Sequence, residues 1–263
     1  MPELPDVEIF RKRARKALNK KIKTVNIKQK KILKTSESTL RKHLNGNKFT
    51  GTSRHGKYLF MKINDGYLLA LHFGMTGEIS YYKKEKPKHI VLEMEVGDKY
   101  NFAVISIRKL GEIDITDNLK KFLKNKNLGK DALSINKKQF LKLTEKSKGS
   151  IKTFLMDQSK IAGIGNIYTD EILFQLGIHP KKKVEDLEEK ELEKLFEKMK
   201  NVLKEAIKHS AIREKMPRNY LIKKRADLAH NKEKADKCPK CGGKIKNITV
   251  GGRSAYFCSK HQK

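Results

Sequence analysis

The sequence lacks the features that mark secreted and membrane proteins. It has only three cysteines in 263 residues, all between positions 238 and 258, which excludes a disulfide framework and points instead to a metal site. No apolar run approaches the ~18 residues of a membrane span, and the first twenty residues lack the apolar core of a signal peptide. Tryptophan is absent, which decides little about function. We therefore predict a cytoplasmic protein without a targeting signal or a membrane partner.

Acidic residues are scarce relative to basic ones. The chain has 61 Lys and Arg against 30 Asp and Glu, a formal net charge of +31, and the excess is spread over its whole length. Such a charge favours a polyanionic partner. Solvated faces of lysine-rich helices account for part of the lysine content, but they do not readily explain a net charge this large.

The hydrophobic pattern changes twice along the chain. Residues 4–19 have apolar side chains at helical spacing, whereas 22–116 contain eight short strand-like segments separated by turn signals. Beyond 117 the period becomes helical, with segments near 118–126, 136–146, 150–158, 167–177 and 186–209. We predict an α+β multidomain protein, with an N-terminal β-sandwich preceded by a helix (1–117), a helical domain (118–210), a charged connection (211–234) and a zinc finger hairpin (235–263).

The C-terminal segment has the spacing of a metal site. A C-x₂-C pair and a C-x₂-H pair stand sixteen residues apart, formed by Cys238, Cys241, Cys258 and His261. This set suits one tetrahedral, structural Zn²⁺ with no open position. The alternative is three small buried thiols beside a chance histidine, but the equal gaps argue against it. The intervening residues predict a hairpin with Arg253 at its tip, where it either contacts phosphate or is simply solvated.

The chain begins Met-Pro-Glu-Leu-Pro. Removal of Met1 would expose the secondary amine of Pro2, and a terminal amine titrates near ~7.8 against ~10.4 for lysine. Pro2 could then attack a sugar carbon to form an iminium, with Glu3 close enough to move a proton. The alternative is a small second residue without a role, and a retained Met1 would block the chemistry.

Four other segments carry candidate residues. Lys57 follows a glycine at the start of an apolar strand, where it could bind phosphate or shuttle a proton. Met75 lies between glycines and could wedge into a base stack or cap a core, and Arg108 and Leu110 could fill the space of an extruded base. A glycine-bearing turn before Asn166 predicts a phosphate site at a helix N-terminus; it is not a dinucleotide fingerprint.

Together these segments resemble the formamidopyrimidine-DNA glycosylase / endonuclease VIII family of base-excision repair enzymes, in order and along nearly the full chain. MPELPDVE, RHGKYL, HFGMTG, DQSKIAGIGNIYTDEILFQLGIHP and the zinc knuckles carry the resemblance, and MPELP with the Met75 turn is closer to the formamidopyrimidine branch. The resemblance implies a catalytic β-sandwich, a helix-two-turns-helix domain and a zinc finger, acting as a monomer on double-stranded DNA that contains a damaged base or an abasic site. It further implies that DNA lies between the two halves of the protein and that the damaged base is flipped out of the duplex.

The resemblance also implies residue roles. Pro2 is the Schiff-base nucleophile, Glu3 the proton donor or acceptor, Lys57 the phosphate ligand that assists β-elimination, and Arg253 the phosphate ligand that serves δ-elimination. Asn166 holds phosphate next to the lesion. The remaining roles are a void-filling triad of Met75, Arg108 and Leu110, DNA contacts by His89 and Lys152, and a lesion pocket that includes Asp6 and Glu171.

The chain departs from the family pattern at four places. Asp6 stands where glutamate is usual, Leu110 where phenylalanine is usual and His261 where a fourth cysteine is usual, and 211–237 lack the glycine-containing loop that covers 8-oxoguanine. The preferred lesion among 8-oxoguanine, ring-opened purines and oxidised pyrimidines therefore stays open. Two other functions also stay open, namely a non-catalytic binder of damaged or kinked DNA and an RNA-associated zinc-ribbon protein.

Overall fold

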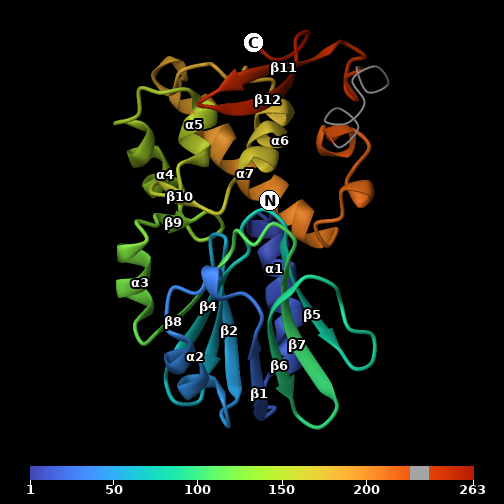
Figure 1. Ribbon diagram of the computed structural model, residues 1–263. Helices are drawn as coiled ribbons and strands as arrows, with labels where there is room; N and C mark the ends of the chain where they lie inside the picture. Colours follow the sequence, from blue (N-terminus) through green and yellow to red (C-terminus); the bar gives the residue numbers. More distant parts are fainter. Residues whose placement is uncertain (226–236) are drawn as a thin grey trace. The chain divides into compact units, whose positions relative to one another are not determined.

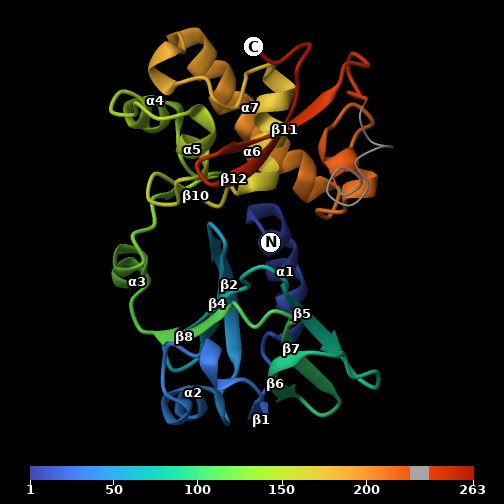
Figure 2. The same cartoon turned by 45° about the horizontal axis from the view of Figure 1, so that its top comes forward.

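The computed structural model describes residues 1–225 and 237–263, which divide into two compact units, Met1–Asn127 and Leu128–Lys263 (Figures 1 and 2). The first unit extends past the predicted boundary at 117 because helix α3 (Leu119–Asn125) packs on it. The Phe122 ring meets the rings of Tyr58 and Phe60 edge to face, at 5.4 Å each. Residues 226–234, at the end of the predicted connection, lie outside the described residues. None of the helices in the described ranges is long and apolar enough to cross a bilayer.

Unit 1 is a sandwich of two four-stranded antiparallel sheets, ordered β1-β6-β7-β5 and β2-β3-β4-β8 (Figure 1). All eight predicted strands are present, and their inward residues form one apolar core between the sheets. The Phe49 ring of β2 approaches the Phe102 ring of β7 across this core, at 6.4 Å. The strands are β1 (Ile22–Ile27), β2 (Phe49–His55), β3 (Tyr58–Ile63), β4 (Leu68–His72), β5 (Gly77–Tyr82), β6 (Ile90–Val96), β7 (Tyr100–Ser106) and β8 (Glu112–Thr116).

Helix α1 (Leu4–Ala14) packs on β2, β3 and β5 through Val7 and Phe10. It ends earlier than the predicted position 19, because a 3₁₀ turn follows at Arg15–Ala17 and Asn19 takes a left-handed φ of 61°. A second helix, α2 (Glu37–Leu44), was not predicted. Its Ser36 cap and its buried Leu40 and Leu44, four residues apart, are the signals that indicate it.

Unit 2 is mainly helical and ends in a hairpin. Its central helix, α6, packs against α5, α7 and β12 and is buried over most of its surface. The long α7 is amphipathic and begins at a capping box on Glu188. The elements are β9 (Lys130–Asp131), α4 (Lys137–Thr144), α5 (Ile151–Met156), β10 (Ile161–Ala162), α6 (Asn166–Leu176), α7 (Glu189–Lys208), β11 (Ile245–Val250) and β12 (Arg253–Cys258), with 3₁₀ turns at Lys30–Ile32 in unit 1 and at Val184–Asp186 and Arg213–Lys215 here.

Candidate functional site

The N-terminus is fixed by a capping box at the start of α1. The Asp6 carboxylate accepts the backbone N–H of Glu3 at 2.8 Å, and the Glu3 carboxylate accepts the backbone N–H of Asp6. Glu3 is 1% exposed, whereas Pro2 is half-buried. The shorter carboxylate at position 6 therefore orients the backbone that carries the predicted nucleophile and its proton-transfer partner.

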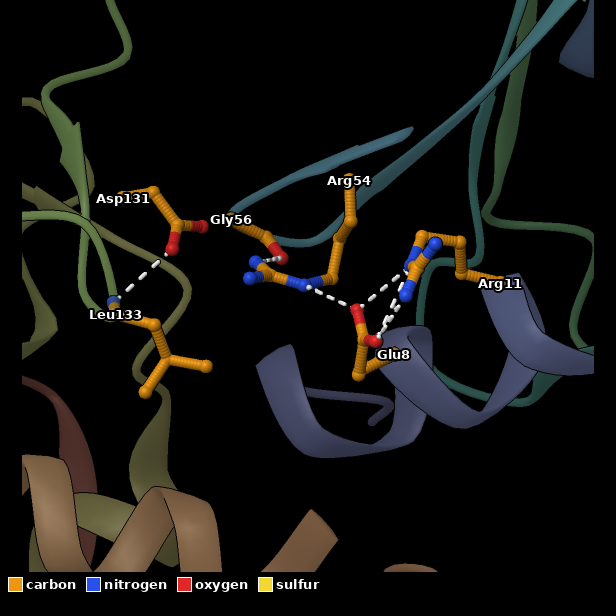
Figure 3. Close-up of polar contacts among 6 residues, drawn as sticks. All are labelled: Glu8, Arg11, Arg54, Gly56, Asp131 and Leu133. Atoms are coloured by element: carbon orange, nitrogen blue, oxygen red, sulfur yellow. Dashed lines mark hydrogen bonds and ion pairs between the residues drawn. The ribbon is translucent and has the colours of Figure 1, made fainter. Parts of the chain in front are cut away.

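Lys57 lies in a tight turn that is tied to the same helix. It is 9% exposed and follows Gly56, whose φ of 55° suits the first turn position of the β2–β3 hairpin. Figure 3 shows that Arg54 donates to the Gly56 carbonyl at 3.1 Å and to the Glu8 carboxylate of α1 at 3.2 Å. Glu8 also accepts from Arg11 at 2.7 Å. Arg54 therefore joins α1, which follows Pro2, to the turn that contains Lys57.

The Glu8 carboxylate is negative at neutral pH. Its partial burial acts to raise its pKa, but the hydrogen bonds and charges of Arg11 and Arg54 outweigh that effect and lower the pKa below its ordinary value. Neither Glu8 nor Arg54 was predicted from the sequence to have a role. Only the i,i+3 spacing of Glu8 and Arg11 was a local signal, since Arg54 lies 46 positions further along the chain.

His72 is a further polar residue near Lys57 that the sequence analysis did not single out, although it stands in the HFGMTG motif. Burial lowers its pKa to about 4, and the charges of Lys57 and Lys126 also lower it, against the opposing charge of Glu112. Its Nδ1 accepts the backbone N–H of Gly74 at 3.3 Å. His72 is therefore a neutral imidazole at pH 7, with its Nδ1 turned to the loop of Met75.

Met75 and Leu110 project from two turns of unit 1 that are locked together. Met75 is 42% exposed and Leu110 is 52% exposed. The Arg108 N–H donates to Thr76 Oγ1 at 3.0 Å, and a Cβ added to Gly74 would lie 2.4 Å from the Leu110 carbonyl oxygen. The structure thus brings the three residues of the predicted void-filling triad onto one surface. Their contact with DNA stays a prediction.

Two more exposed residues border these turns. Ile107 is 60% exposed, which the sequence analysis did not anticipate. His89 is exposed, has a left-handed φ of 58°, and its carbonyl accepts the N–H of Ser106 at 3.0 Å. The His89 loop is therefore joined by a backbone hydrogen bond to the strand end that leads into the Arg108 turn.

In unit 2, a side-chain bridge shapes the turn before Asn166. Gln158 Nε2 donates to the carbonyls of Met156 and Ile164, at 2.8 and 2.7 Å, while Gln158 Oε1 accepts the N–H of Gly163 at 3.0 Å. Asn166 is the first residue of α6, as the sequence predicts. Among the described residues, its buried Oδ1 has no hydrogen-bond partner. The free N–H groups and the positive dipole end at the start of α6 favour an anion there, whereas the orphaned Oδ1 is an acceptor and calls for a donor.

Lys152 lies in the interior of unit 2, with its side chain 0% exposed. Its Nζ donates to the Asp170 carboxylate and, at 3.2 Å, to the Ser254 carbonyl. The other Asp170 oxygen accepts from Arg225 and from the Tyr256 N–H at 3.2 Å. This placement does not favour the predicted contact of Lys152 with DNA, because protein groups enclose its ammonium. It ties α5 to α6 and to the hairpin.

Glu171 is 1% exposed and fixes the backbone after α7. Its carboxylate accepts the N–H of Ile222 at 2.7 Å and the Gln175 side chain at 2.7 Å. Burial raises its pKa to about 7, against the opposing hydrogen bonds and the charge of Lys240. Its place in a lesion pocket stays a prediction, as does that of Asp6; both carboxylates position backbone in this structure.

The four predicted metal ligands converge. The thiol sulfurs and one imidazole nitrogen of Cys238, Cys241, Cys258 and His261 lie within 4.8 Å of one another. The His261 Nδ1 is 3.6 Å from the Sγ atoms of both Cys238 and Cys241. Ligand bonds of about 2.0–2.3 Å in a tetrahedron require ligand separations of about 3.3–3.8 Å. The two His261–sulfur separations and the 3.5 Å between the Cys241 and Cys258 sulfurs fall in that range, as expected for Zn²⁺. A Cβ on Gly243 would lie 3.2 Å from the Cys258 sulfur, so glycine leaves room for the cluster.

The hairpin presents Arg253 at its tip, as predicted. Arg253 is exposed and pairs with Val250 across the turn. A Cβ added to Gly251 would lie 2.4 Å from the Thr153 methyl group, so glycine allows the tip to pack on α5. The predicted phosphate contact and δ-elimination role of Arg253 are consistent with its exposure and stay predictions.

Three family models match the chain in succession. They are described as the formamidopyrimidine-DNA glycosylase N-terminal domain (residues 1–113), the formamidopyrimidine-DNA glycosylase H2TH domain (128–216) and the zinc finger found in FPG and IleRS (235–260). The third match, together with the converging ligands, confirms the prediction of one structural zinc.

Relatives and solved structures match over the full length. The chain is 32% identical to a formamidopyrimidine-DNA glycosylase of Lactococcus lactis subsp. cremoris, over 98% of both chains, and 35% identical to one of Histophilus somni, over 100% of both. Crystal structures of Lactococcus lactis Fpg with DNA containing an abasic site and with DNA containing Fapy-dG superpose with a TM-score of 0.87 at 30% identity, each covering 99% of this chain. With the predicted sandwich, helical unit and zinc finger all present, the chain belongs to the formamidopyrimidine-DNA glycosylase family.

Proposed function

We propose that the chain excises damaged bases from double-stranded DNA and then cuts the strand, with Pro2 as the nucleophile. After removal of Met1, the Pro2 nitrogen bonds to the sugar C1′ as the bond to the base breaks, and the base leaves with its electron pair and takes up the proton that the Pro2 nitrogen loses. Opening of the sugar ring gives an iminium, with Glu3 supplying a proton to the ring oxygen. Loss of the C2′ proton with the 3′ phosphate, and then of the C4′ proton with the 5′ phosphate, completes β,δ-elimination, and water releases Pro2.

The capping box is the observation that carries this proposal. It holds Glu3 in a buried position directly beside Pro2, and it depends on the Asp6 carboxylate. A carboxylate held this way is positioned for proton transfer without a search over rotamers. The Glu8–Arg54 ion pair joins this helix to the turn of Lys57, which supports roles for Lys57 in holding phosphate and assisting elimination.

The phosphate contacts proposed for unit 2 rest on separate observations. Asn166 stands at the start of α6, where the helix dipole attracts an anion, and Arg253 is exposed at the hairpin tip. The net charge of +31 suits a nucleic acid partner, and the Lactococcus lactis structures contain DNA. We propose a monomer that works in the cytoplasm on nucleoid DNA.

Borohydride trapping tests the mechanism. Incubation with an abasic duplex, and with duplexes that each carry one lesion, is expected to give a covalent adduct in the presence of borohydride, and peptide mass spectrometry should locate it at Pro2. Blocking the N-terminus should reduce the adduct by at least about 100-fold, and Pro2→Gly, which keeps a terminal primary amine, should reduce it less. Lys12→Ala, which removes an exposed amine of the same helix, should leave it unchanged.

Three outcomes overturn the proposal. They are the absence of an adduct with every duplex, an adduct that survives both Pro2→Gly and a blocked N-terminus, and native protein that retains Met1. Salt-dependent binding to abasic duplex without cleavage would support a non-catalytic binder instead. Preference for structured RNA in competition binding would support the RNA-associated alternative.

A further inference from the structure

Helix α6 ends against the metal centre rather than against solvent. An α-helix leaves its last four carbonyl groups without partners inside the helix, and those groups carry a partial negative charge. At the end of α6, Gly177 takes a left-handed φ of 74° and closes the helix. The carbonyls around this point turn toward the C-terminal knuckle, which begins at Cys258 and ends at Lys263.

Four of these carbonyls accept hydrogen bonds from the zinc finger. The Phe174 carbonyl meets His261 Nε2 at 3.2 Å, and the Gln175 carbonyl accepts from Lys240 Nζ at 3.0 Å. The Gly177 carbonyl accepts from the Lys263 N–H at 2.9 Å, and the Ile178 carbonyl accepts from Gln262 Nε2 at 2.9 Å. The finger therefore supplies a C-terminal cap for α6, with the Lys240 ammonium at the negative end of the helix dipole.

His261 is the member of this cap that is itself one of the four metal ligands. Its Nδ1 faces the cysteine sulfurs, whereas its Nε2 faces Phe174. An imidazole that binds a metal through Nδ1 must carry its proton on Nε2, so the metal-bound form is a donor to the Phe174 carbonyl. A metal-bound cysteine thiolate at this position would have no N–H group to donate to the Phe174 carbonyl. The histidine thus adds a bond between the metal centre and the helix that cysteine cannot make.

Packing at this junction is close. The rings of Phe174 and His261 meet edge to face at 4.8 Å, and a Cβ on Gly177 would lie 2.9 Å from the His261 carbonyl oxygen. Phe174 also shares one buried cluster with Cys238 and Cys258. Any displacement of the knuckle would therefore change the packing of the last turn of α6.

We propose that His261 is both a zinc ligand and a C-terminal cap of α6, so that metal loading sets the local stability of this helix. Because Asn166 opens the same helix, we extend the inference to the phosphate contact proposed at its other end. The coupling to DNA rests on the function proposed above, whereas the coupling to the helix does not.

Imidazole NMR on the wild-type zinc protein tests the bond itself. A ¹H–¹⁵N long-range spectrum is expected to show His261 metal-bound at Nδ1 and protonated at Nε2, with a slowly exchanging Nε2 proton. The Nδ1-protonated tautomer, or an Nε2 proton that exchanges as fast as that of an exposed histidine, would overturn the proposal. No variant is needed, so a folding defect cannot obscure the result.

Hydrogen exchange tests the effect on the helix. His261→Cys keeps four ligands but removes the donor, so the zinc content measured by mass spectrometry should stay at one per chain while amides near Phe174 exchange about 2- to 12-fold faster. His179→Gln removes a neighbouring histidine that packs on Phe257, and it should leave both readouts unchanged. Unaltered exchange in zinc-loaded His261→Cys contradicts the proposal. If that variant does not hold zinc, the NMR result decides alone.

Chelation separates this inference from the proposed function. Removing zinc from the wild-type chain should speed exchange throughout residues 166–178 but not in the β2–β3 hairpin of unit 1, which serves as the internal reference. Unchanged exchange over 166–178 in the metal-free chain contradicts the coupling. Helix exchange that responds to zinc while abasic duplex is neither bound nor cleaved would refute the proposed function and leave the coupling intact.

Discussion

The two units position their polar groups by different means. In unit 1, candidate residues stand on turns and at a helix end, and they are held by backbone close approaches, a capping box and partly buried ion pairs. In unit 2, Lys152, Asp170 and Arg225 form an ion cluster in the interior, and four ligands gather around a metal site. The exposed Met75 and Leu110 can meet a substrate directly, whereas the enclosed Lys152 and Asp170 act by fixing the backbone around them.

Burial shifts the pKa of a base in unit 1 and the pKa of an acid in unit 2 in opposite directions. It lowers the pKa of His72 in unit 1 to about 4 and raises the pKa of Glu171 in unit 2 to about 7. In both cases the neutral form gains relative to the charged form. The same physical effect therefore makes His72 an uncharged neighbour of the cationic Lys57, and gives Glu171 a titration close to neutral pH.

The largest effect is expected from breaking the interior ion cluster. Asp170→Ala leaves the fully buried Lys152 ammonium without its carboxylate, which should lower the free energy of unfolding of unit 2 by about 3–5 kcal/mol. Chemical denaturation with separate probes in each unit measures this loss. Glu193→Ala removes an exposed ion pair with Lys137 and should change stability by less than about 0.5 kcal/mol. A loss below about 1 kcal/mol for Asp170→Ala would show that the cluster is dispensable.

The next effect is a pH dependence carried by Glu171. Its pKa is raised to about 7 in the folded state, so the folded state binds the proton more tightly than the unfolded chain, where the value is about 4.5. The contribution of Glu171 to the free energy of unfolding is therefore complete below pH 4.5. It decreases as the pH rises to about 7, by about 3 kcal/mol in total.

Glu171→Gln should remove this decline, which denaturation curves between pH 4.5 and 7.5 would detect as a difference from the wild type. Gln keeps an acceptor for the Ile222 N–H, so the variant tests the charge rather than the shape. Glu197→Gln, an exposed carboxylate of α7, is the matched control and should leave the wild-type slope in place. Parallel curves for wild type and Glu171→Gln would refute the assignment.

A smaller effect is expected at the locked turns of unit 1. Gly74→Ala places a Cβ against the Leu110 carbonyl at a φ of 56°, which should cost about 1–3 kcal/mol and loosen the Arg108 turn. Gly46→Ala has the same left-handed backbone, at 78°, but no atom within 4 Å of its new Cβ, so it should cost about 1 kcal/mol. Equal losses for the two variants would mean that the close approach contributes nothing beyond backbone strain.

The smallest effect is expected for the ion pair that joins α1 to the Lys57 turn. Glu8→Gln should lower the free energy of unfolding by about 1 kcal/mol at pH 7. The pKa of Glu8 is lowered in the folded state, so this difference should be full above pH 4.5 and disappear as the pH falls further. Glu95→Gln, whose partner Lys23 is 3.8 Å away and exposed, should show almost no difference. A Glu8→Gln loss that persists at pH 3 would contradict the ionic explanation.

Much of the fold could be predicted from local patterns. Eight alternating segments predicted the strands, and helical spacing predicted five later helices, because a buried face imposes the period of its element. The metal ligands were also readable, since two-residue gaps place both members of a pair at one turn. Helix α2 was missed although its Ser36 cap and leucine pair were visible, and α3 was assigned to the wrong side of the boundary because its partner rings lie far away in sequence.

Roles that depend on contacts between residues far apart in the chain could not be predicted from the sequence. The sequence by itself determined the N-terminal Pro2-Glu3 pair, the knuckle spacing and the turn before Asn166, because each is encoded by neighbouring residues. Only the tertiary structure decided that Lys152 is enclosed by Asp170, that Arg54 joins Glu8 to the Lys57 turn, and that His261 faces the end of α6. Those contacts join residues from 18 to 87 positions apart, and their energies depend on burial and charge around them, which no local pattern of residue types specifies.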